Sequence, residues 1–256
     1  MTWTPAKSAD NLRFVTNPKC CVLFALGREA RPFFRQFPVQ KKLASTPVRA
    51  FLCGNESCSI LVLETGVGRE RMEQALTWLL DQPNFPKLII SAGFSGALRA
   101  GLKIADIIVA TDVIDEDGAS WPVPWPSEIS SQTSNRGKIL TVSGTVAEPD
   151  EKLAFGQKHD AIAVDMETAV VARRCTEKGI PFGCIRAISD DVHTPLSADV
   201  DYVIVNGRVS GRRLLWRLLC RPRFAAELWR LAKHTRVAAD RLAVALGELI
   251  NVAVDF

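Results

Sequence analysis

The sequence predicts a single α/β domain, a three-layer αβα sandwich with a mixed, mainly parallel central sheet. Short apolar runs of strand length alternate with helical stretches, a pattern typical of strand–helix–strand units. Two apolar runs end in glycines and a third ends in acids, and open α/β sheets place ligand sites at such strand ends. A length of 256 residues is enough for one large domain of this kind.

The expected strands are short and largely apolar, because a buried strand presents apolar side chains on both faces. In chain order we expect strands at 19–26, 50–53, 59–64, 87–92, 106–113, 138–143, 161–164 and 180–188. The stretch 115–137 is rich in Pro, Ser, Trp and Gly and is interpreted as a long loop.

The expected helices follow several of these strands. In order they are a helix at 32–37 after a turn at 27–32, an amphipathic helix at 69–81, helices at 150–158 and 166–174, and helix over most of 200–250. Pro222 should break the last of these near Arg221, because proline removes a helical hydrogen bond.

We divide the chain into a flexible N-terminal arm (1–18), a catalytic domain (19–207) and a basic helical C-terminal extension (208–256). The N-terminus lacks the apolar core of a signal peptide, and no run of 18 apolar residues occurs. Seven cysteines lack paired metal-ligand spacing, and three histidines are too few for a zinc site. We therefore expect a cytoplasmic protein with reduced thiols and no metal.

The net charge of +4 is unevenly distributed, because the extension is basic and the rest of the chain is slightly acidic. Within the extension, the segment 211–219 interleaves arginines with Leu and Trp. This pattern fits an amphipathic helix packed on the body, or attachment to an anionic membrane surface, which would place the protein at the inner membrane. Nucleic-acid binding is not expected, since the basic residues are confined to the tail and no recognition module occurs.

Two carboxylate clusters flank one expected helix and one buried strand. Asp165 and Glu167 precede the helix, and Asp190 and Asp191 follow the strand. In a dry cleft one acid can hold a substrate while another moves a proton. Each cluster also has a structural interpretation, as helix-dipole partners or as turn residues. Arg186 is a plausible partner for the second cluster, but four residues along a strand separate side chains too far for direct pairing.

Small residues or acids follow three expected strands, at 27–29, 93–96 and 189–190. Glycine at a strand end lets a ligand approach the backbone, and the next N–H groups can bind an oxyanion or phosphate. Each glycine could equally make only a tight turn. The segment 66–68 lacks the full spacing of a dinucleotide-binding loop, so we reject that function.

Three segments together resemble the nucleoside phosphorylase and nucleosidase superfamily. They are AVDMET (163–168), PFGCIRAISDD (181–191) and SAGFSGAL (91–98). The chain is similar in particular to the methylthioadenosine/S-adenosylhomocysteine nucleosidases, and ALGREARP (25–32) with the basic tail resembles the hopanoid-associated phosphorylase branch. The resemblance covers about residues 20–205.

The resemblance implies cleavage of the N-glycosidic bond of an adenosine-type nucleoside, by phosphorolysis or hydrolysis. Methylthioadenosine, S-adenosylhomocysteine or an adenosylated lipid would be the substrate. It implies no cofactor, with inorganic phosphate as the co-substrate of phosphorolysis, and a homo-oligomer.

The resemblance also implies roles for individual residues. Asp190 matches the acid that protonates the purine at N7, and Ser189 helps to hold it. Glu167 matches the glutamate that binds the ribose 2′- and 3′-hydroxyls, and Met166 lies under the sugar. Glu29 matches the glutamate that positions the attacking water. The loop that lines the sugar and nucleophile pocket matches Gly93, Phe94, Ser95 and Gly96.

Two features depart from the family pattern. The segment 142–148 has no aromatic where nucleosidases carry one that stacks on adenine, so Phe94 or a residue of 121–125 would have to replace it. The nucleophile stays open, because Glu29 favours water whereas Arg28 and Arg31 could bind phosphate.

A different class of function is a non-catalytic nucleoside-binding or membrane-associated regulatory module on the same fold. The missing aromatic favours this alternative. The presence of both Glu167 and Asp190 argues against it, because a binding module does not need an acid at the base.

Overall fold

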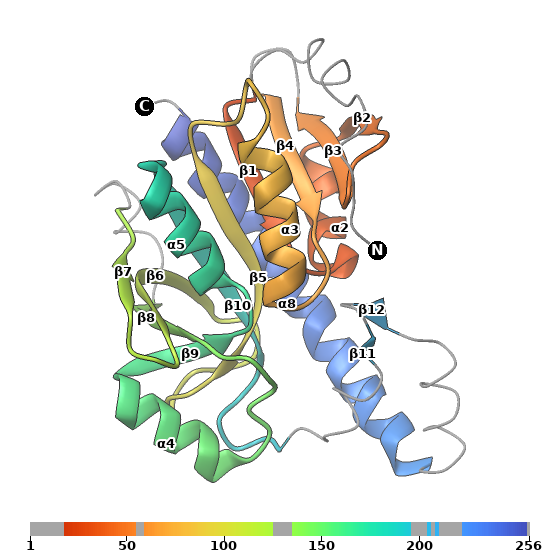
Figure 1. Ribbon diagram of the computed structural model, residues 1–256. Coiled ribbons are helices and arrows are strands. Elements are labelled where there is room, and N and C mark those ends of the chain that lie inside the picture. Colours follow the sequence, from red (N-terminus) through yellow and green to blue (C-terminus); the bar gives the residue numbers. More distant parts are fainter. Residues whose placement is uncertain are drawn as a thin grey trace.

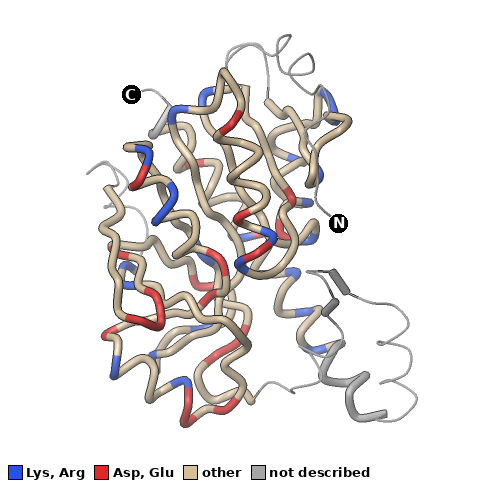
Figure 2. Tube along the Cα trace, viewed as in Figure 1, with Lys and Arg blue, Asp and Glu red and all other residues tan. Residues whose placement is uncertain are grey.

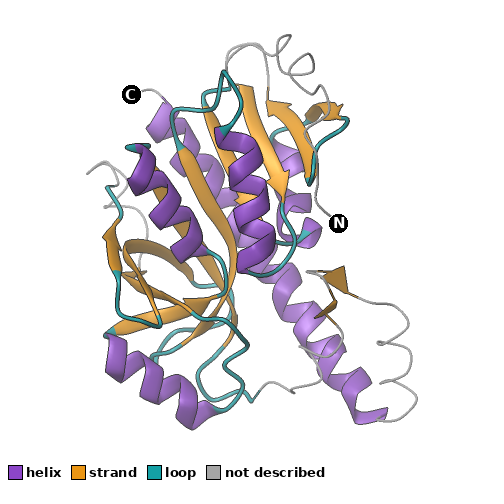
Figure 3. Cartoon of the chain, viewed as in Figure 1, coloured by secondary structure: helices purple, strands orange, loops and turns teal. Residues whose placement is uncertain are grey.

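The computed structural model describes residues 18–54, 59–124, 135–195, 204–205, 208–209 and 222–254. A ten-stranded mixed sheet forms the centre, and helices pack against both of its faces (Figures 1 and 3). The expected N-terminal arm lies, up to residue 17, outside the described residues, as does the Arg/Leu/Trp segment 211–219.

The strands are paired in the order β10-β6-β8-β9-β5-β1-β4-β3-β2, with β7 on β6 and a further pairing of β10 with β5. Their bounds are β1 (Cys20–Phe24), β2 (Val39–Leu43), β3 (Arg49–Gly54), β4 (Ser59–Glu64), β5 (Ile89–Ala97), β6 (Ile107–Asp115), β7 (Ser120–Pro122), β8 (Asn135–Thr141), β9 (Ala161–Asp165) and β10 (Phe182–Asp190).

The sheet closes on itself at one end, which corrects the expected sandwich. Because β10 pairs with both β6 and β5, the strands β5, β10, β6, β8 and β9 form a closed ring. The sheet is mixed, as predicted, but it is not mainly parallel. The pairs β1–β4, β1–β5, β5–β10, β6–β8 and β8–β9 are parallel, and β2–β3, β3–β4, β5–β9, β6–β7 and β6–β10 are antiparallel.

The length of β5 explains the closure. This strand runs between the two halves of the sheet (Figure 1), and its first residues pair with β1 while Gly96 and Ala97 pair with β9. The sequence predicted that the strand stops at Gly93, but it continues through 93–96 as regular strand. Glycine permits the bend that a strand needs to change neighbours.

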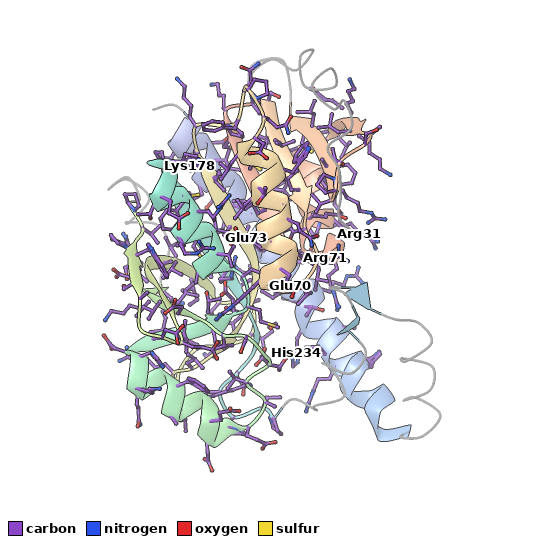
Figure 4. The ribbon with its side chains drawn as sticks, in the orientation of Figure 1. Arg31, Glu70, Arg71, Glu73, Lys178 and His234 are labelled. Carbon is purple, nitrogen blue, oxygen red and sulfur yellow. The ribbon has the colours of Figure 1, made fainter. Side chains whose placement is uncertain are left out.

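Helices cover both faces, as the layer prediction required. One face carries α3 (Arg69–Leu80) and α5 (Thr168–Lys178), and the other carries α2 (Gly27–Gln36) and α8 (Pro222–Val254). The remaining helix, α4 (Pro149–His159), packs near β9. On the first face, Glu73 accepts a 3.0 Å hydrogen bond from Arg173 and so links α3 to α5 (Figure 4).

Two local predictions in the N-terminal half are wrong. Residues 27–32 do not form a turn, because α2 begins at Gly27 and contains Pro32. The carboxylate of Glu29 accepts the N–H of Leu26, the residue that caps the helix, and so stabilises this early start. The strand β2 was not predicted. Four of its five residues are exposed and three are polar, so its sequence VQKKL has no apolar run that would indicate a strand.

The C-terminal helix is partly as expected. The described part of α8 begins at Pro222 and runs for 33 residues, and the residues on the other side of the predicted break, 210–221, lie outside the described residues. Helix at 204–209 is wrong, since 204–205 and 208–209 pair as short antiparallel strands. Ala238, Leu242 and Leu246 of α8 are buried against the body. Its described basic residues are exposed: Arg230, Lys233, Arg236 and Arg241. Figure 2 marks the Lys and Arg positions of the chain in blue. None of the described helices has the length and apolarity needed to cross a membrane.

Candidate active site

A cavity of about 200 Å³ lies where the start of α2, the end of β5, the β9–α5 junction and the end of β10 meet. Most of the predicted site residues line it, although they come from distant parts of the chain: Arg28, Glu29, Phe94, Ser95, Gly96, Met166, Glu167, Ser189 and Asp190. Gly93 and Arg31 do not line it. The sequence did not predict the contribution of α8, which places Leu231 and Thr235 on the wall.

The parallel pairing of β5 with β10 brings two of the predicted segments together. Asp190 lies opposite Gly96 in this pair. A Cβ atom at Gly96 would come within 2.9 Å of Asp190 Oδ2, and one at Gly93 within 3.0 Å of Glu29 Oε1. The glycines therefore make room for two acids, and Gly93 lies behind Glu29 rather than in a ligand-binding loop.

Glu29 is buried and held at both oxygens. Its Oε2 accepts the N–H of Leu26 at 2.7 Å, and its Oε1 accepts the N–H of Phe94 at 3.0 Å. Burial raises the pKa of this carboxyl, and the two N–H groups, together with Arg186 and Arg28, offset part of that rise. Glu29 is thus a fixed carboxyl group that binds a proton more readily than an exposed glutamate.

Glu167 is the buried capping residue of α5, one position before the helix that was predicted to include it. Its Oε1 accepts the N–H of Gly68 at 2.7 Å, and Oε2 has no hydrogen-bond partner among the described residues. Burial raises the pKa of Glu167 to about 7, and the nearby charge of Asp165 adds to this rise. One oxygen is therefore available to accept hydrogen bonds from a ligand.

Asp190 is the last residue of β10 and is also buried. Its Oδ1 accepts a 2.8 Å hydrogen bond from Ser189 Oγ, and its Oδ2 lies 2.6 Å from Nζ of Lys152. The sequence analysis missed Lys152, whose side chain has no exposed surface. The one available signal was weak: a cation in the first turn of the expected helix 150–158, where the helix dipole opposes it.

Asp165 forms a buried ion pair with Arg186 beside the cavity. Its Oδ2 accepts hydrogen bonds from Nε and Nη2 of Arg186 at 2.9 and 2.6 Å, and its Oδ1 accepts one from Thr141 Oγ1 at 2.7 Å. The prediction that Arg186 does not pair directly with Asp190 is confirmed, because Arg186 pairs with Asp165 of another strand. Asp191 is a turn residue, since its Oδ1 accepts the N–H of His193 at 2.9 Å.

The strand β5 contributes one ring and one hydroxyl group to the cavity, those of Phe94 and Ser95. Phe94 is the one aromatic side chain among the described lining residues. The segment 142–148, which contains no aromatic residue, contributes Val142, Gly144, Thr145 and Val146 to the wall. Trp121 packs against the core and does not line the cavity, and Trp125 lies outside the described residues. The hydroxyl of Ser95 is buried without a hydrogen-bond partner in the described part of the chain.

Arg31 lies in a second groove, of about 380 Å³, between α2 and α8 (Figure 4). Arg28 and Thr235 line both the groove and the cavity, so the two adjoin. Arg236 adds a further cation to the groove, whereas Arg35 is paired with Asp240 at 3.2 Å. Of the two arginines predicted to bind phosphate, Arg28 thus lies at the edge of the cavity and Arg31 lies outside it.

The described residues include no cluster of three or more His, Cys, Asp or Glu side chains that could hold a metal ion. The polar side chains that line the cavity carry carboxyl and hydroxyl groups and the guanidinium of Arg28. Such groups can transfer protons and bind the hydroxyls of a sugar.

Comparison with known proteins gives a consistent result. The sequence model of the phosphorylase superfamily matches residues 19–128 and 127–219. A 5′-methylthioadenosine/S-adenosylhomocysteine nucleosidase from Bacillus licheniformis is 28% identical over 161 residues, which cover 53% of this chain and 69% of that protein.

Solved structures with about 17% identity share the fold. The nucleosidase of the same name from Helicobacter pylori has a TM-score of 0.70, with 92% of this chain and 99% of that one covered. The futalosine hydrolase from Helicobacter pylori has a TM-score of 0.71, with 92% and 98% covered.

Proposed function

This chain belongs to the phosphorylase superfamily and is an enzyme of the nucleosidase type, and we propose that it hydrolyses the N-glycosidic bond of an adenosine-type nucleoside in the cavity lined by Glu29, Glu167 and Asp190. The observation that carries the proposal is the arrangement of these three acids. They come from three distant segments, are each at most 8% exposed, and are each held by a defined hydrogen bond.

The reaction needs an acid at the base, because the electron pair of the glycosidic bond moves onto the purine as the bond breaks. In the proposed mechanism Asp190 gives a proton to N7 of the purine and becomes a carboxylate. General acid catalysis of this kind contributes roughly 10²–10⁴-fold to the rate. Ser189 holds Oδ1 of Asp190 in place through its 2.8 Å hydrogen bond.

The sugar needs an acceptor for its vicinal hydroxyls. We assign this role to Glu167, because Oε1 is fixed by Gly68 while Oε2 has no partner among the described residues. A carboxylate that accepts two hydroxyl hydrogens makes charge-assisted hydrogen bonds, which are stronger than neutral ones. Met166 lies beside it on the wall, under the expected sugar position.

Glu29 is proposed to orient the attacking water and take its proton. The buried carboxyl is held from both sides, so its direction is fixed before the substrate binds. Its burial raises the pKa toward the range in which a general base is efficient. Water would then add to C1′ as the purine leaves.

Phosphorolysis is the second candidate, and Arg28 is the observation in its favour. Arg28 lies at the border between the cavity and the arginine-lined groove, where it could bind an anionic nucleophile. Hydrolysis is preferred because the Glu29 carboxyl would repel phosphate from the same position.

The test is an assay for adenine release from methylthioadenosine and S-adenosylhomocysteine, with and without phosphate, with the sugar product identified. Hydrolysis predicts free sugar and no dependence on phosphate, whereas phosphorolysis predicts a sugar 1-phosphate. Asp190→Asn should lower turnover by roughly 10²–10⁴-fold, the contribution of a general acid, while nucleoside binding persists. Absence of release from any 5′-substituted adenosine would exclude the proposal and favour a binding module.

A further inference from the structure

We propose that Lys152 is a positioning residue for the proton transfer: it binds one oxygen of Asp190 and stabilises the carboxylate that remains after Asp190 has protonated the purine. This inference rests on the proposed function of Asp190 as the acid. The contact itself is independent of that function, because Nζ lies 2.6 Å from Oδ2 and the lysine side chain has no exposed surface.

The position of Lys152 is unfavourable except for this contact. Burying an ammonium group removes its hydration, which is costly unless the charge is paired and hydrogen-bonded. Lys152 also lies in the first turn of α4, where the positive end of the helix dipole repels a cation. The burial and the helix dipole both disfavour a cation at position 152, and the described acidic side chain that Lys152 contacts is Asp190.

All three hydrogens of the ammonium group have acceptors. They bind Oδ2 of Asp190 at 2.6 Å and the carbonyl oxygens of Asp191 and Thr194 at 3.0 Å each. An ammonium group has no lone pair, so Oδ2 cannot donate a proton to it. The acidic proton must therefore be on Oδ1, the oxygen beside Ser189.

The proton on Oδ1 moves to N7, the electron pair of the glycosidic bond moves to the purine, and Asp190 becomes a carboxylate whose Oδ2 is already bound to Lys152. Solvent returns the proton to Asp190 before the next turnover. A preformed cation beside a developing negative charge needs no reorganisation during the reaction, which is the basis of electrostatic catalysis.

Other charged groups line the same cavity: Arg28 and Glu29 from α2, Asp165 at the end of β9, and Glu167 at the start of α5. None of them forms a hydrogen bond or ion pair with Asp190. Among the described residues Lys152 is the charged side chain that Asp190 contacts, so its effect can be isolated by substitution.

The experiment measures kcat and KM for adenine release as a function of pH in wild type, Lys152→Met and the control Lys138→Met, whose exposed ion pair with Asp160 lies outside the cavity. Lys152→Met should lower kcat by roughly 10²–10³-fold, as the loss of one preorganised charge-stabilising group does. KM should change little, because Lys152 does not line the cavity.

A double-mutant cycle with Asp190→Asn separates positioning from general stability. If Lys152 acts through Asp190, Lys152→Met should cost no further activity in the Asp190→Asn background. An unchanged kcat in the single variant, or an equally large loss in the Asp190→Asn background, would overturn the inference. Lys152→Arg keeps the charge and serves if Lys152→Met does not fold. It should lower kcat with little change in KM, and a raised KM with unchanged kcat would equally overturn the inference. Failure of wild type to release adenine would instead refute the proposed function.

Discussion

The main-chain N–H of Phe94 donates a 3.0 Å hydrogen bond to Oε1 of Glu29, so β5 holds a carboxyl group that α2 supplies from 65 positions earlier in the chain. The N–H of Leu26 binds the other oxygen at 2.7 Å. Because both oxygens accept N–H groups, the site requires a carboxylate here and not an amide. This requirement leads directly to a test of Glu29.

Glu29→Gln should lower kcat by roughly 10²–10⁴-fold, the usual contribution of a general base. The amide can replace only one of the two acceptor oxygens, and its NH₂ group would face an N–H donor. The measurement is the initial rate of adenine release. The control is Glu73→Gln, which changes a half-exposed glutamate on α3 that lies outside the cavity. A folded Glu29→Gln enzyme with wild-type kcat would exclude Glu29 as the base.

Glu167→Gln should stabilise the protein at alkaline pH. Burial raises the pKa of Glu167 from 4.5 to about 7, so its contribution to stability is fully present below 4.5 and is lost as the pH rises through 7. At 1.36 kcal/mol per pKa unit, the loss is roughly 3 kcal/mol. Glutamine stays neutral at every pH and can still accept the N–H of Gly68.

Urea unfolding at pH 5 and pH 8 measures this effect. The free energy of unfolding of Glu167→Gln should be close to that of wild type at pH 5 and higher at pH 8. The same variant should lose roughly 10²–10⁴-fold in kcat/KM, since it lacks two charge-assisted bonds to the ribose, each worth roughly 1.5–3 kcal/mol. Equal stability at both pH values would contradict the raised pKa of Glu167.

The sequence predicted the acids of the site because the signal for each was local. Glu167 and Asp190 stand at the ends of apolar runs, so their burial at an edge of the sheet followed from strand periodicity. Lys152 could not be found in this way, because its partner is 38 positions away and no local pattern links them. The closed ring was missed for a related reason: Gly93 was interpreted as the end of a strand, whereas β5 continues to Ala97 and gains β9 as a neighbour.

Two serines of β5 offer a matched pair of substitutions. Ser95 Oγ has no partner among the described residues, whereas Ser91 Oγ accepts a 2.7 Å hydrogen bond from Arg186 Nη2. Ser95→Ala should leave the melting temperature unchanged or slightly higher and raise KM by about 3- to 10-fold, the value of one neutral hydrogen bond to a substrate. Ser91→Ala should lower the free energy of unfolding by roughly 1–3 kcal/mol, because it leaves part of a buried guanidinium unpaired. A destabilised Ser95→Ala variant with normal KM would show that its hydroxyl binds protein and not substrate.

Asp165→Asn tests the support beneath the site. Its carboxylate and the guanidinium of Arg186 form a buried pair, with Nη2 2.6 Å from Oδ2. Breaking such a pair leaves an uncompensated buried charge and should cost roughly 3–5 kcal/mol. Asp160→Asn is the matched control, since the Asp160 side chain is 88% exposed and solvent screens its ion pair with Lys138, so its loss should barely change stability.

The same substitution should also act on Glu167, because the charge of Asp165 is part of what raises the pKa of that carboxyl. In Asp165→Asn the pKa of Glu167 should fall below 7, and the rise of KM at acid pH, where Glu167 takes up a proton, should begin at a lower pH than in wild type. The checks are thermal unfolding of both variants and the pH dependence of KM for Asp165→Asn. If the variant is destabilised but its KM profile does not move, Asp165 supports the fold without tuning Glu167.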